Sequence, residues 1–212
     1  MISKEYKKLI NQINAVGSQK ADGYSTNLLT DIPESERDEA EKLILETYYE
    51  KNDTDILVLF PLLKKHDGIN ALKEIINNYS IPSEEAGLIA FLLFNNTGDL
   101  RYLEIIEKNI IASNYDYHYI VLAKSLSPGC DVYRMFTRIY KHCTETKALQ
   151  ATIDGILYNK GIMSDANDLN EVIRLRELIL YMRDIEATER EQVINKLESG
   201  CFDKYKSLTK QQ

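Results

Sequence analysis

Apolar residues recur along most of the chain at the three- and four-residue spacing of an amphipathic α-helix. The first such segment covers residues 1–16, where Ser3 can act as the N-cap. No segment shows the strict alternation of apolar and polar residues that a half-buried strand requires. The pattern therefore predicts an all-α fold of about ten to eleven helices, in a single domain that spans residues 1–212.

Breaks in this periodicity separate the predicted elements. Residues 17–32 hold several Gly, Ser and Asp residues without a helical spacing, so we expect a loop or tether there. Residues 33–160 contain short helices at nearly regular intervals, separated by Pro, Gly and Asp turn signals. One of them is predicted over residues 100–112, directly after a Thr-Gly-Asp sequence.

The C-terminal part of the chain shows a different spacing. Residues 161–200 should form the longest helix of the chain, ending near Arg183, and then a last helix. Residues 201–212 carry three lysines and follow a terminating glycine, so we expect a frayed tail there.

A helix–turn–helix unit recurs in the middle of the chain. Apolar positions repeat 31 residues apart in two consecutive units, pairing Ile69 with Leu100 and Leu72 with Leu103. Helical hairpins at a fixed period bury a shared core by stacking, which predicts an α-solenoid. An irregular helical bundle whose helices have similar lengths is the alternative.

These near-repeats, together with the Leu-Phe-Pro-Leu-Leu sequence at residues 59–63, resemble the HEAT and armadillo class of α-solenoids over residues 33–160. In size, acidity and repeat style the chain also resembles helical-repeat bacterial immunity proteins, which neutralise a toxin delivered by a neighbouring cell. The resemblance implies a HEAT-like fold of stacked antiparallel helical hairpins. It also implies that the function is to bind a toxin domain.

The charge pattern bears on the kind of partner. The chain has 33 acidic and 26 basic residues among 212, which gives a net charge of −7. Nine acids and three bases lie between Glu34 and Asp55, so this stretch alone carries a charge of −6. Such a surface would repel nucleic acid and attract a basic protein.

Neither a membrane nor a bound metal or cofactor is expected. The longest nearly uncharged apolar stretch, residues 86–94, is less than half of the roughly 20 residues that span a bilayer. No secretory signal is visible, and three cysteines without C-x-x-C spacing favour reduced thiols and a cytoplasmic location. His142 and Cys143 are adjacent, but neighbours on a helix point about 100° apart, which disfavours a metal site.

The predicted helix of residues 34–49 offers one surface for a basic partner. Opposite its core stripe it presents Glu34, Asp38, Glu41, Leu45 and Tyr49, with Glu39 beside them. Apolar groups framed by acids are what a contact surface for a basic protein presents. Two alternatives remain open: the apolar pair could pack under the N-terminal helix, and the acids could form a solvated helix face.

A second surface follows from the 31-residue register. One predicted helix opens with Glu84 and Glu85, and the next opens at the equivalent place with Tyr115, Asp116 and Tyr117. We therefore expect these five residues on the same edge of the solenoid. Tyrosine is enriched where one side of the ring is wet, which suits an interface. Alternatively, the two glutamates only stabilise a helix N-terminus.

The sequence thus predicts a non-catalytic protein-binding module, monomeric outside its complex. The most specific hypothesis is an immunity protein whose acidic surface covers the active site of a basic toxin, with a nuclease as the expected target. An intracellular scaffold or adaptor is the alternative. An enzyme is the third possibility, although the motifs of nucleophile elbows, P-loops, zinc proteases and dinucleotide sites are absent from the sequence.

Overall fold

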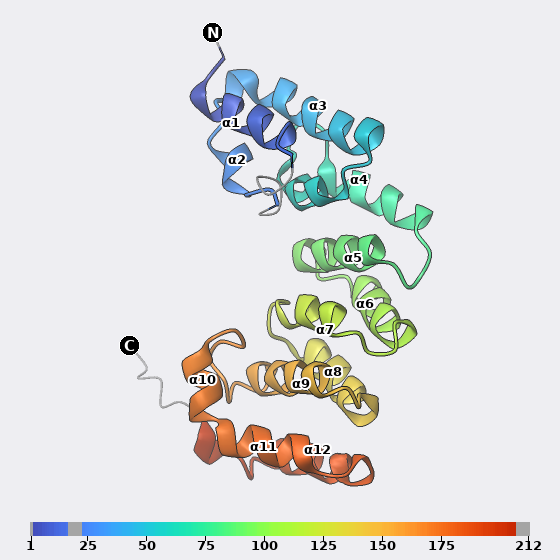
Figure 1. Ribbon diagram of the computed structural model, residues 1–212, viewed down its shortest axis with the longest axis vertical. Helices are drawn as coiled ribbons and strands as arrows, with labels where there is room; N and C mark the ends of the chain where they lie inside the picture. Colours follow the sequence, from blue (N-terminus) through green and yellow to red (C-terminus); the bar gives the residue numbers. More distant parts are fainter. Residues whose placement is uncertain (1, 17–22, 207–212) are drawn as a thin grey trace. The chain divides into compact units, whose positions relative to one another are not determined.

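The computed structural model describes residues 2–16 and 23–206 (Figure 1). Every regular element among these residues is helical and none is a strand, which confirms the all-α prediction. The chain divides into two compact units, named here the N-terminal unit (Met1–Ser80 with Leu92–Gly98) and the C-terminal unit (Ile81–Phe91 with Asp99–Gln212). Helix α5 (Glu84–Thr97) contributes residues to both units, and the single domain of residues 1–212 stays a prediction.

The N-terminal unit is built around a long helix, α3. Its elements are α1 (Lys4–Ile13), α2 (Asn27–Thr30), α3 (Glu34–Lys51), the 3-10 segment η2 (Thr54–Leu62), α4 (Gly68–Ile75) and the 3-10 turn η3 (Ile76–Asn78). Helix α1 packs on α2 and α3, while η2 packs on α2, α3 and α4. The core between them contains fully buried side chains from five of these elements, among them Leu9, Leu29, Ile44, Phe60 and Leu72.

Local sequence explains how these elements begin and end. Ser3 caps α1 as expected, because its Oγ accepts a hydrogen bond from the N–H of Tyr6 at 3.1 Å. Pro61 lies inside η2, where it cannot donate a main-chain hydrogen bond, and this segment is 3-10 rather than α. Gly68 begins α4 against η2, since a Cβ there would lie 1.9 Å from the carbonyl oxygen of Phe60.

The predicted loop of residues 17–32 is only partly described. Residues 17–22 lie outside the described residues. Helix α2 occupies the end of the predicted loop, and its Leu29 is fully buried. A helix of four residues is too short to produce a recognisable periodicity, so the sequence pattern did not reveal it.

The C-terminal unit is centred on α9. Besides the first part of α5, its elements are α6 (Leu100–Ala112), α7 (Tyr117–Lys124), α8 (Cys130–His142), α9 (Thr146–Asn159), α10 (Leu169–Arg174), α11 (Arg176–Asp184), the 3-10 turns η4 (Ala187–Glu189) and η5 (Asp203–Tyr205), and α12 (Arg190–Glu198). Helix α9 contacts α7, α8 and α11, and nearly all of its middle residues are buried. None of the helices in the described part of the chain is long and apolar enough to cross a bilayer.

The expected long helix ending near Arg183 is wrong, since the longest described helix is α3, with 18 residues. The segment is broken at Leu175 into α10 and α11. The reason is a polar cluster at the end of α10. Arg174 donates to the carbonyl oxygens of Ile162 at 2.8 Å and Tyr205 at 2.5 Å. These bonds hold the end of α10 against the segment before it and against the C-terminal residues of the described chain.

The contact with Tyr205 also corrects the expectation of a frayed tail for residues 201–206. The ring of Phe202 lies 6.0 Å from that of Tyr181 on α11. These residues are therefore docked on the C-terminal unit, and residues 207–212 lie outside the described part.

Candidate functional site

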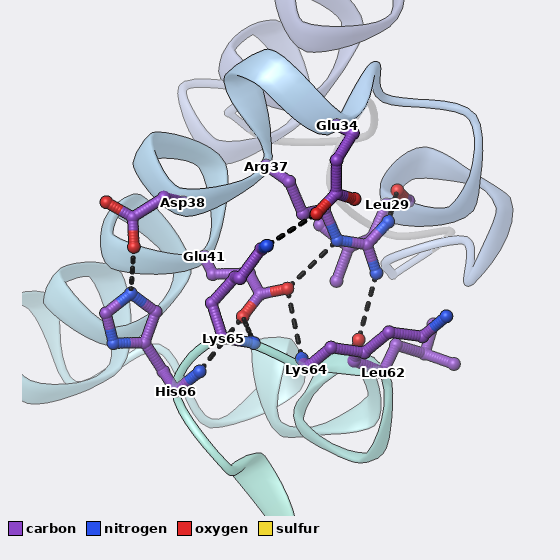
Figure 2. Close-up of polar contacts among 9 residues, drawn as sticks. All are labelled: Leu29, Glu34, Arg37, Asp38, Glu41, Leu62, Lys64, Lys65 and His66. Atoms are coloured by element: carbon purple, nitrogen blue, oxygen red, sulfur yellow. Dashed lines mark hydrogen bonds and ion pairs between the residues drawn. The ribbon is translucent and has the colours of Figure 1, made fainter.

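Glu41 is not on the surface of α3, and its assignment to a partner-binding face is wrong. Its side chain is fully buried. Figure 2 shows the carboxylate surrounded by four donors: Nε of Arg37 at 2.9 Å and the backbone N–H groups of Lys64, Lys65 and His66 at 3.0, 2.7 and 3.2 Å. Burial alone would raise the pKa of Glu41, but these hydrogen bonds outweigh it and the pKa is lowered.

Arg37 completes this cluster from the other side. Its guanidinium donates to the carbonyl oxygen of Leu29 in α2 and, at 2.9 Å, to that of Leu62 in η2 (Figure 2). The Arg37–Glu41 pair therefore ties α3 to both α2 and η2 and fixes the loop that precedes α4. Its arrangement is that of a structural anchor, because every charged oxygen and nitrogen already has a partner inside the protein.

The exposed acids of α3 are also partly neutralised. Glu34 pairs with Lys65 at 2.5 Å, and Asp38 pairs with Lys42 at 2.6 Å and with the His66 ring at 2.9 Å. The hydrogen bond from Lys65 lowers the pKa of Glu34, and that from Lys42 lowers the pKa of Asp38. The charge of −6 was counted over residues 34–55, and Lys65 and His66 lie after that stretch. The count therefore overstated the negative charge of this face.

The remaining predicted residues of α3 are more accessible. Glu39 is exposed and has no side-chain partner among the described residues. Tyr49 is 57% exposed and Leu45 is half-buried. The exposure of Tyr49 disfavours the alternative in which it packs under the N-terminal helix.

Part of the second predicted surface forms a groove. Within the C-terminal unit, α5 and α7 border a groove of about 620 Å³, called here the α5/α7 groove. It is lined by Glu84, Leu88, Asp116, His118, Tyr119, Val121, Leu122 and Ser125. Of the five residues expected on one edge, two, Glu84 and Asp116, line this groove. Burial raises the pKa of Tyr119, and the negative charges of Glu84, Asp116 and Glu85 raise it further, in that order. Glu85 is therefore also near the groove.

Specific contacts bring α5 and α7 to this groove. The backbone of Ser83, directly before α5, is held by the buried side chain of Asn109 from α6. Asn109 accepts from the Ser83 N–H at 2.9 Å and donates to the Ser83 carbonyl at 2.7 Å. Gly87 then allows Tyr119 to approach, since a Cβ there would lie 3.3 Å from the tyrosine ring and 2.7 Å from the Asn109 amide nitrogen.

Asp116 begins α7 on the other side of the groove. Its carboxylate accepts a hydrogen bond from the N–H of His118 at 2.8 Å and caps the helix. The second carboxylate oxygen has no partner among the described residues. Glu84 is exposed and likewise has no partner in this part of the chain. The groove therefore combines an apolar lining with carboxylate oxygens that can accept hydrogen bonds.

Tyr115 does not lie in the predicted helix and does not line the groove. Its backbone is left-handed, with φ of 61°, and its N–H donates to the carbonyl oxygen of Ile110 at 2.8 Å. This bond closes the end of α6, so α7 begins two residues later than Tyr115. The expectation that this helix opens with Tyr115 is therefore wrong.

Tyr117 lines a different cavity of about 280 Å³, called here the basic concavity. Its lining residues are Tyr117, Lys124, Thr146, Lys147, Gln150, Ala151, Asp154 and Arg183. Sequence reasoning missed this cavity because its cations come from three helices, α7, α9 and α11, that are widely separated in the chain. No local motif connects them.

The described residues contain no group of three or more His, Cys, Asp or Glu side chains arranged to hold a metal ion. Cys143, next to His142, is buried at the end of α8, whereas Cys130 and Cys201 are exposed. All three thiols are free.

No protein-family model matches this chain. Neither a curated protein nor a solved structure matches it. The likeness to HEAT-type repeats and to immunity proteins therefore remains a prediction from the sequence.

Proposed function

We propose that this chain is a non-catalytic protein-binding module that takes a basic segment of its partner into the α5/α7 groove. The observation that carries the proposal is the combination of an apolar lining with two carboxylates. Among the described residues, that of Glu84 has no partner, and that of Asp116 uses one of its two oxygens. Leu88, Val121 and Leu122 offer half-buried apolar surface to a partner. Such a surface contributes most of the contact energy in an interface, while the rim charges select the partner.

The most specific form of this proposal is a cytoplasmic immunity protein. A toxin that acts on nucleic acid needs a basic substrate groove, and an acidic module that covers this groove would exclude the substrate. Opposite charges would also speed the association, and salt would slow it. The α5/α7 groove replaces α3 as the main contact surface in this proposal, because several acids of α3 are already paired within the protein.

We also infer that α6–α7 and α8–α9 are stacked hairpins of the HEAT type. The packing of α6 on α8 and of α7 on α9 supports this, since equivalent helices of successive hairpins are then in contact. The register residues Leu72 and Leu103 are both buried, and so is Met135, which follows Leu103 by 32 residues; this is further support. The repeat weakens at the first turn of α6, where Leu100 is 48% exposed.

Affinity capture from an extract of the native cell, with three baits, tests the function. The baits are the wild-type chain, Glu84→Lys and Glu104→Lys. Glu104 is an exposed residue of α6 outside the groove, so its variant is matched in charge. We expect a basic polypeptide that is retained by the wild type and Glu104→Lys, lost from Glu84→Lys, and released by high salt.

The captured polypeptide then decides between the two classes of binding module. An immunity protein predicts a single stoichiometric partner whose toxic or nuclease activity is abolished when the chain is added. Subunits of a larger assembly, retained without regard to their charge, would favour a scaffold. Equal retention by all three baits would contradict the α5/α7 groove as the contact surface.

A further inference from the structure

We propose that the basic concavity of the C-terminal unit binds a phosphate group. Three cationic side chains from three helices, Lys124 of α7, Lys147 of α9 and Arg183 of α11, line one cavity of about 280 Å³. They face a single carboxylate among the lining residues, that of Asp154. This excess of positive charge is local, in a chain whose net charge is −7. The proposal is independent of the protein-binding function.

Lys124 gives the strongest indication of a missing partner. Its side chain is 12% exposed, and Oδ2 of Asp154 lies 3.9 Å from its Nζ, too far for a hydrogen bond. The other oxygen of Asp154 accepts from the Gln150 amide at 2.9 Å. The described residues therefore offer this ammonium group no acceptor at hydrogen-bond distance. An oxyanion in the cavity would supply acceptors at hydrogen-bond distance.

The other two cations also have donors to offer. Lys147 is exposed and has no ion pair among the described residues. Arg183 donates from Nε to its neighbour Asp184 at 2.8 Å, which leaves its two terminal nitrogens for a ligand. Tyr117 and Thr146, which both carry hydroxyl groups, also line the cavity. Several donors on separate helices suit an anion with three or four acceptor oxygens better than a carboxylate with two.

Two acidic residues at or near the cavity, Asp154 and Glu145, carry charge that opposes the binding of an anion. Burial raises the pKa of Asp154, whose Oδ1 accepts from the Gln150 amide at 2.9 Å. It is the one acid among the lining residues, against three cations. Glu145 caps the N-terminus of α9 by accepting from the N–H of Ala148 at 2.6 Å. The helix N-terminus is therefore already occupied, and the side chains rather than the backbone would hold the phosphate.

The phosphate could be free or attached to a larger molecule, and two titrations of the full chain distinguish these sources. Inorganic phosphate and O-phosphoserine are added at constant ionic strength, and amide resonances are followed by NMR. We expect saturable shifts for Thr146, Lys147 and Gln150. Tighter binding of inorganic phosphate would indicate the free ion, and tighter binding of O-phosphoserine would indicate a phosphomonoester.

Three variants make the test specific. Lys147→Ala and Lys124→Gln should each weaken binding about tenfold, the effect of losing one hydrogen bond to a charged group. Lys147 is exposed, so its variant should keep the fold even if Lys124→Gln does not. Lys108→Ala, an exposed lysine of α6 outside the cavity, should bind as the wild type does. Shifts that fail to saturate, or that persist unchanged in Lys147→Ala, would overturn the proposal.

Discussion

Arg37 and Glu41 lie one helical turn apart on α3 and form an ion pair of 2.9 Å whose two side chains are almost completely buried. The carboxylate also accepts from three backbone N–H groups of the loop before α4. Glu41, which the sequence pattern places on the surface of this helix, therefore lies in the interior beside Arg37. This pair is the polar centre of the N-terminal unit.

Replacing Glu41 should strongly destabilise the N-terminal unit. Glu41→Ala leaves the Arg37 guanidinium buried without its counter-charge and frees three backbone N–H groups, so we expect a loss of about 3–5 kcal/mol. Glu39→Ala, on the exposed side of the same helix, should change stability by less than about 0.5 kcal/mol. Urea denaturation followed by circular dichroism measures both. Similar effects of the two variants would contradict the buried anchor.

Asn109 should matter for the position of α5 as well as for stability. Its side chain makes two hydrogen bonds to the backbone of Ser83, and Asn109→Ala leaves both backbone groups without their partner. We expect a loss of about 1–3 kcal/mol in the free energy of unfolding. Asn195→Ala is the control, because Asn195 is exposed and its side chain has no partner among the described residues. An Asn109→Ala protein as stable as this control would refute the assigned role.

The parts of the fold that could be predicted are those with a local signal. Asp99 follows a Thr-Gly sequence and accepts from the N–H of Arg101 at 3.0 Å, and α6 has the bounds Leu100–Ala112 expected from the sequence. The side-chain caps at Ser3 and Asp67 mark the starts of α1 and α4 in the same way. A cap is recognisable because its donor and acceptor are at most three residues apart.

The features that could not be predicted depend on partners far along the chain. The acceptor groups of Glu41 meet N–H donors more than 20 residues away, so a helical wheel cannot reveal that the residue is interior. Arg174 breaks the expected long helix by bonding to Tyr205, 31 residues later. For the candidate site, Glu84 and Asp116 line one groove, whereas Tyr117 lines another cavity, and no register relates the three cations of the basic concavity.

Glu171 should control part of the acid sensitivity of the protein. The hydrogen bond from Arg174 lowers the pKa of Glu171 to about 2. Because the folded-state pKa is depressed, the stabilisation is present above the unfolded-state pKa and is lost as the pH falls towards the folded value. Melting temperatures of the wild type should therefore fall between about pH 5 and pH 2.

The variant Glu171→Gln removes this titration. Its melting temperature should be lower than that of the wild type at neutral pH, and the difference between the two should shrink as the pH falls. Glu177→Gln, an exposed residue at the start of α11, serves as the control and should follow the wild-type profile. A constant difference between wild type and Glu171→Gln at every pH would contradict the assignment.

Removing residues 201–212 should lower the melting temperature. The truncation deletes the acceptor that Arg174 uses at Tyr205 and exposes the face of Tyr181 that Phe202 contacts. For a protein of this size each kcal/mol lost corresponds to about 2–4 °C. Differential scanning calorimetry gives the shift, and Phe202→Ala should reproduce part of it. An unchanged melting temperature would restore the interpretation of residues 201–206 as a frayed tail.

The central claim is that the α5/α7 groove, rather than the acidic face of α3, contacts a basic partner. Hydrogen–deuterium exchange of the chain, alone and with the captured partner, tests it most directly. The proposal predicts slower exchange in the complex for residues 84–91 and 116–125, with the difference lost in Glu84→Lys. Protection confined to residues 34–51, with no change at the groove, would contradict the claim.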